Sequence, residues 1–134
     1  MGIRKTISRA LLRLARSPRM KPLLRWVMTH ASFALPVERV RETETLLAFY
    51  HPRPLYPVHI LLVPKEPFGD LMDVPLEGSG FLGELLDTVQ VLVREHGLEE
   101  EGYQLIINGG AHQDVPHLHV HLVSGVGEET GCPR

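Results

Sequence analysis

Three histidines that alternate with aliphatic residues form the segment of this sequence best suited to chemistry. The segment begins at Gln113, continues through His117, His119 and His121, and ends at Val123. Because side chains alternate between the two faces of a strand, the three imidazoles are predicted to share one face and the aliphatic side chains the other. The aliphatic face belongs on a core. The imidazole face is therefore expected to meet solvent, a partner or a substrate.

One chemistry that this pattern supports is nucleophilic attack on phosphorus. A neutral imidazole is a nucleophile near pH 7 without prior deprotonation. One ring nitrogen should donate to a carbonyl, so that the other presents its lone pair, while neighbouring imidazoles donate to the phosphate oxygens. A turn at Gly109 and Gly110 can bring backbone N–H groups close to an anion. The sequence has no Walker-type loop and no dinucleotide fingerprint.

A metal site is the alternative. Zinc binds nitrogen ligands in a tetrahedral arrangement. Along an extended strand, however, His117 and His121 lie about 13 Å apart, so all three histidines cannot easily share one ion. A metal would need a further ligand, for which His59 and His112 are the candidates.

The elements that must position these residues point to an α+β fold. Apolar periodicity, prolines and glycines predict a mostly antiparallel sheet of about five strands with one main helix. The helix is predicted over Phe81–His96, with Gly97 as its stop. Strand patterns cover Val37–Tyr50, Val58–Val63, Tyr103–Ile107 and His117–Val123.

The front of the chain differs in charge from the remainder. Eight basic residues precede the first acidic residue, Glu38, whereas the remainder carries six basic and all sixteen acidic residues, a net charge of −10. Residues 1–35 are therefore predicted to be a basic, amphipathic N-terminal helical extension, and residues 36–134 the main domain. The extension could pack on the domain, rest on an anionic membrane through residues 1–25, or act as a targeting segment. The lone cysteine, Cys132, favours a cytoplasmic location, with a peripheral membrane location as the alternative.

The histidine segment resembles the signature of the histidine triad (HIT) superfamily. The run Tyr56–Lys65 also matches the buried strand of that family, which ends in Val/Ile-Pro-Lys, and Leu47-Ala-Phe49 matches the strand before it. The similarity extends from about Val37 to Val123. The resemblance implies a HIT-like fold for residues 36–134.

The resemblance also implies an activity. Family members are nucleotide hydrolases or transferases, phosphoramidases among them, that work without a metal or other cofactor and are typically homodimers. His119 would attack the α-phosphorus and form a nucleotidyl-histidine intermediate. The remaining roles follow the family pattern, and no specific nucleic acid is expected as a partner. His117 and His121 would support the nucleophile or contact phosphate, His59 would belong to the hydrogen-bonded histidine set, Asn108, Gln113, Asp114 and the Val115 backbone would line the phosphate side, and Phe49 and Leu61 would form the base pocket.

Two positions depart from the family pattern. Tyr50-His51-Pro52 stands where the family often has an acidic residue that holds the ribose hydroxyls. Asp114 stands where the family commonly has Ser or Thr, and a carboxylate near a phosphate repels it unless it turns away or is protonated. Adenosine-type specificity is therefore open. A non-catalytic nucleotide-binding module, docked by its basic arm, is the alternative to an enzyme.

Overall fold

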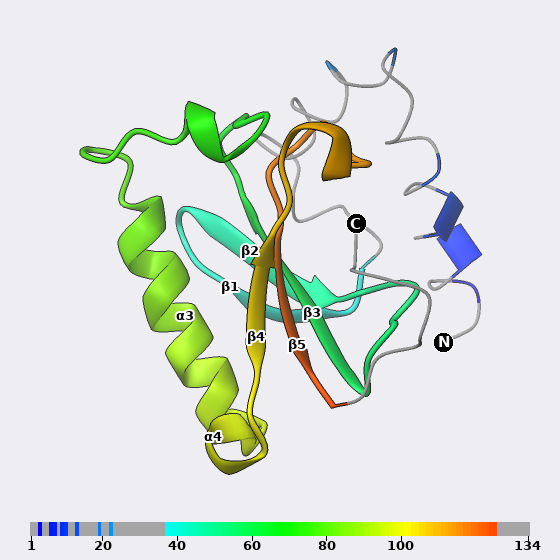
Figure 1. Ribbon diagram of the computed structural model, residues 1–134. Helices are drawn as coiled ribbons and strands as arrows, with labels where there is room; N and C mark the ends of the chain where they lie inside the picture. Colours follow the sequence, from blue (N-terminus) through cyan, green and yellow to red (C-terminus); the bar gives the residue numbers. More distant parts are fainter. Residues whose placement is uncertain are drawn as a thin grey trace.

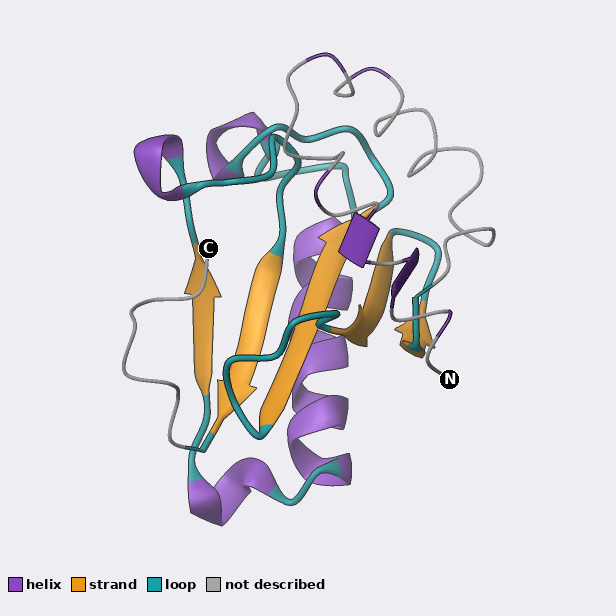
Figure 2. Cartoon of the chain, turned by 90° about the vertical axis from the view of Figure 1, so that its right-hand side faces the viewer, coloured by secondary structure: helices purple, strands orange, loops and turns teal. Residues whose placement is uncertain are grey.

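The computed structural model describes residues 37–125 and eight positions before them. Five strands form one sheet in the order β1-β2-β3-β5-β4, and every neighbouring pair is antiparallel. The helix α3 lies along one face of this sheet (Figure 1 and Figure 2). The predicted α+β class with five strands and one main helix is confirmed. The elements are β1 Arg39–Glu42, β2 Leu46–Tyr50, β3 Val58–Pro64, η3 Leu71–Asp73, α3 Phe81–Glu95, α4 Leu98–Glu101, β4 Gln104–Ile107, η4 Gly110–His112 and β5 Val120–Ser124.

The helix α3 follows directly from its apolar spacing. Phe81, Leu85, Val89 and Leu92 recur at helical spacing and are buried. The helix ends at Glu95, and Gly97 follows with a φ of 65°, a left-handed conformation that glycine adopts without strain. The short helix α4 after Gly97 was not predicted.

The core occupies both faces of the central strands. On the face under α3, alternate residues of β2, β3 and β5 pack with the helix. On the opposite face, a second cluster comprises Leu47, Phe49, Leu61 and Val63. Burial on both faces explains why β2 and β3 are almost continuously apolar.

The segment predicted as one strand, Val37–Tyr50, is two strands joined by a tight turn. The Thr43 N–H donates to the Leu46 carbonyl over 2.9 Å and closes the turn. The Thr45 hydroxyl donates to Glu84 of α3 over 2.5 Å, and the Thr43 hydroxyl donates to the same carboxylate. The turn is therefore anchored to the helix, and β1 lies at the edge of the sheet.

Most of the predicted extension 1–35 lies outside the described residues. The described positions from Ile3 to Arg13 are helical. Ile3 is 77% exposed and Ile7 is 44% exposed, so at these positions the apolar stripe does not pack on the domain. Arg9 Nε donates to the Pro52 carbonyl over 3.0 Å, next to the end of β2. Within the described part of the chain, no helix is both long enough and apolar enough to cross a bilayer.

Candidate active site

The histidine segment lies mostly ahead of its strand. The strand was predicted over His117–Val123, but β5 begins at Val120. The pairing places Leu62 opposite Val120, so the same register would place Pro64 opposite Leu118. Pro64 has no N–H to donate, and the Leu118 N–H bonds the Phe68 carbonyl over 2.9 Å instead. The pairing of β3 with β5 therefore ends at Val120, and His121 is the one member of the triad that lies within the strand.

Side chains in the segment nevertheless alternate as predicted. Leu118, Val120 and Leu122 belong to the core under α3. The imidazoles of His119 and His121 lie 5.0 Å apart between ring centroids, in an edge-to-face arrangement. The aliphatic and imidazole side chains therefore separate onto two sides of the segment.

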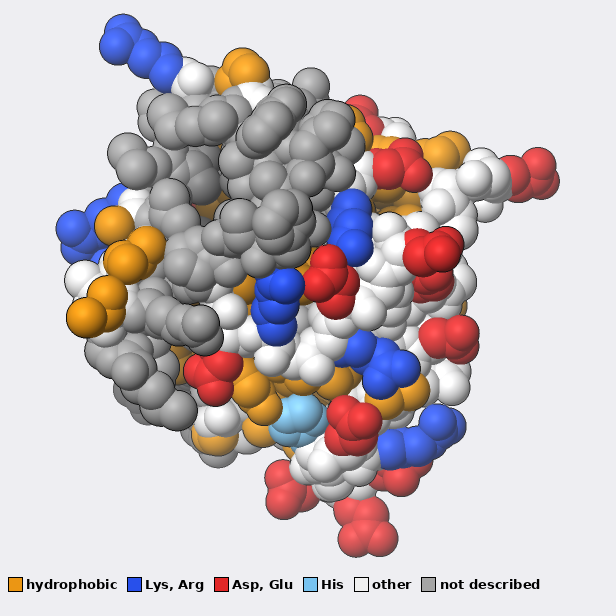
Figure 3. Space-filling model, turned by 180° about the vertical axis from the view of Figure 1, so that it is seen from behind, with side chains coloured by type: hydrophobic (Ala, Val, Ile, Leu, Met, Phe, Trp, Pro, Cys, Tyr) orange, Lys and Arg blue, Asp and Glu red, His pale blue; other side chains and the backbone are white. Residues whose placement is uncertain are grey.

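Of the three surroundings predicted for the imidazole side (solvent, a partner or a substrate), the structure does not show the first, because all three imidazoles are buried. His117 is 3% exposed, His119 7% and His121 0%. Figure 3, which views the molecule from behind, shows one small patch of histidine between acidic and hydrophobic side chains on that face. The imidazoles are therefore held in a protein environment that excludes most water.

The hydrogen bonds of the triad assign its ring protons. His119 Nδ1 lies 2.8 Å from the His117 carbonyl oxygen, which can only accept, so Nδ1 carries the proton. The lone pair of His119 therefore resides on Nε2. His117 Nε2 lies 3.0 Å from the Pro64 carbonyl oxygen, so this nitrogen donates as well. The Pro64 carbonyl, which lies where the pairing of β3 with β5 ends, thus orients His117.

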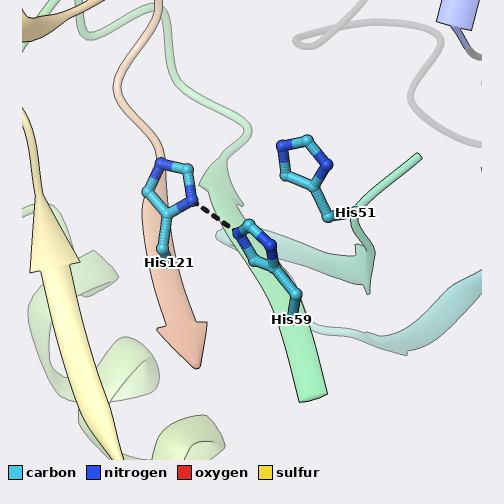
Figure 4. Close-up of side chains that lie close together, drawn as sticks. All are labelled: His51, His59 and His121. Carbon is cyan, nitrogen blue, oxygen red and sulfur yellow. Dashed lines mark hydrogen bonds between the residues drawn. The ribbon is translucent and has the colours of Figure 1, made fainter. Parts of the chain in front are cut away.

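A second chain of hydrogen bonds assigns the protons of His59 and His121. The Leu55 N–H donates to His59 Nδ1 over 3.1 Å, so His59 carries its proton on Nε2. That nitrogen donates to His121 Nδ1 over 3.0 Å (Figure 4). The proton of His121 is therefore on Nε2, which is buried and has no hydrogen-bond partner among the residues that the structure describes. A buried N–H donor without a partner is ready to bind an acceptor from a ligand.

The electrostatics keep this pair neutral. Burial lowers the pKa of His59 to about 4. Burial, followed by repulsion from His119, His59 and His51, lowers the pKa of His121 to about 2. Both rings are therefore uncharged at neutral pH, and His121 acts as a neutral donor.

Within the described residues, His51, His59 and His121 form a group that could hold a metal ion. Each offers one ring nitrogen, and these atoms lie within 4.8 Å of one another. The hydrogen bonds oppose this use. The Arg53 and Leu55 N–H groups occupy Nδ1 of His51 and His59, so binding an ion at Nε2 would move a proton onto a nitrogen that faces a backbone donor. His112, the other suggested ligand, is exposed in η4 and lies outside this group.

The predicted substrate-binding residues fall into two sets. Phe49 and Leu61 face each other across β2 and β3 and are buried in the second cluster. The other four precede the triad in the connection from β4 and are half-buried: Asn108, Gln113, Asp114 and Val115. In this conformation the Gln113 side chain donates to the Gly69 carbonyl over 2.6 Å, and the Val115 carbonyl accepts from the His117 N–H over 2.8 Å. These two groups support the loop rather than point to an open site.

His51 is the member of the site that sequence reasoning missed as a functional residue. Its ring stacks on that of His59, with centroids 4.3 Å apart and an interplanar angle of 27°. Since Tyr50 pairs with Ile60, the register of β2 and β3 places His51 directly opposite His59. A hairpin register, drawn from the two predicted strands, could have revealed this contact.

Comparisons with known proteins agree with this fold. The HIT domain model matches residues 33–128. An uncharacterized HIT-like protein from Synechococcus elongatus is 42% identical over 93 residues, which cover 68% of this chain and 81% of that protein. The purine nucleoside phosphoramidase of Escherichia coli is 32% identical over 93 residues, which cover 68% of this chain and 78% of that enzyme.

Solved structures give the same result. A HIT family hydrolase from Legionella pneumophila is 34% identical, with a TM-score of 0.67 over 74% of this chain and 90% of that one. A histidine triad protein from Clostridium difficile is 27% identical, with a TM-score of 0.68 over 81% of this chain and 94% of that one. With a matching domain model, matching relatives and the triad itself in place, this chain belongs to the histidine triad (HIT) family.

Proposed function

We propose that this protein is a nucleotide hydrolase or transferase in which His119 is the nucleophile. The observation that carries the proposal is the tautomer of His119, which donates from Nδ1 to the His117 carbonyl and so has its lone pair on Nε2. An imidazole held in this way attacks phosphorus without first losing a proton. The similarity to a purine nucleoside phosphoramidase and to a HIT family hydrolase supports the same chemistry.

The reaction has two steps. His119 Nε2 attacks the α-phosphorus of a nucleotide phosphoramidate, phosphoanhydride or related ester, a P–N bond forms, and the bond from phosphorus to the leaving group breaks. The leaving group departs with the electron pair and takes up a proton from solvent, and the acceptor of the second step returns one. Water or another acceptor then attacks phosphorus, which breaks the P–N bond and releases His119. The buried Nε2–H of His121 donates to an oxygen at phosphorus and offsets the negative charge that grows in each transition state.

The burial of the site adds a condition. His119 is 7% exposed, so a nucleotide reaches Nε2 only when the surroundings of the triad open. Closure over the bound substrate would then exclude water and strengthen the hydrogen bonds to phosphate. Phe49 and Leu61 form the apolar pocket for the base in this proposal. Assembly as a homodimer is a further part of the proposal, while a cytoplasmic location and membrane contact through residues 1–25 remain predictions.

The proposal is tested with His119→Ala and a panel of nucleoside phosphoramidates and dinucleoside polyphosphates. Loss of the nucleophile should reduce kcat by about 10³-fold or more, while circular dichroism shows an intact fold. The matched control is His112→Ala, which removes an exposed histidine and should retain activity. Mass spectrometry of the wild-type protein, quenched during turnover, should find a nucleotidyl adduct on the peptide that contains His119. Unchanged turnover in His119→Ala would refute the assignment, and tight nucleotide binding with neither turnover nor adduct would indicate a binding module.

A further inference from the structure

His51 closes one side of the histidine cluster. The His51 N–H donates to the His59 carbonyl over 2.9 Å, which extends the β2–β3 pairing by one residue and places both side chains on one face of the sheet. The His51 ring lies parallel to that of His59 at 4.3 Å and is 6.1 Å from that of His121 (Figure 4). His59 is 2% exposed and His121 0%, whereas His51 is half-buried. His51 therefore covers His59 on the side nearer to solvent.

One loop fixes the ring protons of both stacked histidines. The Arg53 N–H donates to His51 Nδ1 over 2.9 Å, and the Leu55 N–H donates to His59 Nδ1 over 3.1 Å. Each ring therefore carries its proton on Nε2. If His59 were protonated, Nδ1–H would face the Leu55 N–H, donor against donor, and the bond that orients the ring would be lost. The arrangement requires His59 to stay neutral.

We propose that His51 is a positioning residue, whose ring keeps water from His59 and thereby holds His59 as the neutral donor to His121. The inference rests on the proposed function, because its purpose is to keep the Nε2–H of His121 directed at substrate. His51 lies outside the triad motif of His117, His119 and His121.

In the described part of the chain, few charged groups surround His59, so its neutral state depends on the exclusion of water by His51. Among the residues that the structure describes, the titratable groups that face the ring besides His51 are His121, at 5.3 Å between centroids, and Tyr56, whose ring meets it edge-on at 5.7 Å. His119 follows next, beyond His121. The neutral state of His59 therefore depends on burial, which agrees with a pKa lowered to about 4 by desolvation.

Four substitutions separate shielding from charge. His51→Phe keeps a stacked ring and should leave the titration of His59 close to that of the wild type. His51→Ala removes the cover and should raise the midpoint by on the order of one pH unit or more. His51→Asp places a carboxylate beside His59 and should raise the midpoint above that of its neutral, matched control His51→Asn.

The titration is followed by ¹⁵N-detected NMR of the imidazoles, without substrate. The expected spectra show His59 as the Nε2–H tautomer at neutral pH in the wild type and in His51→Phe. An unchanged His59 midpoint in His51→Ala, or equal midpoints in the Asp and Asn variants, would overturn the proposal. If His51→Ala fails to fold, the comparison of His51→Asn, which also lacks the aromatic cover, with His51→Phe still decides, because shielding predicts the higher His59 midpoint in His51→Asn.

A kinetic measurement links this shielding to turnover. The acid limb of the kcat profile should move to higher pH in His51→Ala and stay in place in His51→Phe, whereas a merely structural role would lower kcat at every pH alike. Because the NMR titration needs no turnover, it can succeed even if His119→Ala shows that the proposed reaction is wrong. An acid limb that does not move despite a shifted His59 midpoint would refute the positioning role and leave the His119 assignment intact.

Discussion

Lowering the pH from about 7 to about 5 is expected to reduce the free energy of unfolding by about 4 kcal/mol through His59 and His121. Burial lowers the pKa of His59 to about 4 and that of His121 to about 2, from an ordinary value of 6.5. In this pH window the unfolded chain binds protons at both rings and the folded protein does not. Stability is therefore full above about pH 6.5 and falls as the pH drops, with each histidine losing about 2 kcal/mol by pH 5. A domain of this size has about 5–15 kcal/mol in all, so the effect is large.

The assay is urea unfolding followed by circular dichroism at a series of pH values between about 7 and 5. The His121→Asn variant loses one of the two titrating groups, so its stability should fall by about 2 kcal/mol less than that of the wild type over the same range. His112→Asn is the control, because His112 is exposed and its replacement should leave the pH dependence unchanged. Equal wild-type stability at both ends of the range would refute the reasoning, as would the same pH dependence in both variants.

Two further predictions concern the scaffold. Gly125→Ala should destabilise the fold by about 1–3 kcal/mol, because Gly125 has a φ of 90° and an added Cβ would lie 2.7 Å from Pro57 Cγ; Gly102→Ala, at a φ of 89° with nothing within 4 Å, should lower the melting temperature less. Leu105→Glu combined with Ile107→Glu should convert a homodimer into monomers in light scattering, because these residues are 39% and 40% exposed on the edge strand β4. A wild-type protein that is already monomeric would contradict the second prediction.

The sequence predicted most where its pattern was strong and local. The helix over Phe81–His96 and the strand over Val58–Val63 appear as α3 and β3, within one residue at each end. The turn at Thr43–Thr45 was missed because neither glycine nor proline marks it. Its geometry instead depends on a carboxylate 39 residues away, that of Glu84, which no local pattern reveals.

In the candidate site too, the features set by local residue spacing could be predicted, and those set by contacts between distant segments could not. The triad and its alternation could be predicted, since they follow from residue spacing alone. The burial of the imidazoles could not, because it depends on which segments pack over them. The role of the Pro64 carbonyl and the contact of His51 with His59 both required a strand register, which spacing within one segment cannot supply.

Pro64 has a consequence that reaches beyond its own strand. The N–H of residue 65 points to β2, so a residue at position 64 points its backbone groups toward β5. Any other residue at position 64 would supply a backbone N–H there. The pairing of β3 with β5 could then continue for two more residues, to Leu118. That longer ladder would compete with His117 for the carbonyl of residue 64 and draw the first imidazole away from its place. The missing N–H of Pro64 thus keeps the segment from His117 to His119 out of the regular sheet.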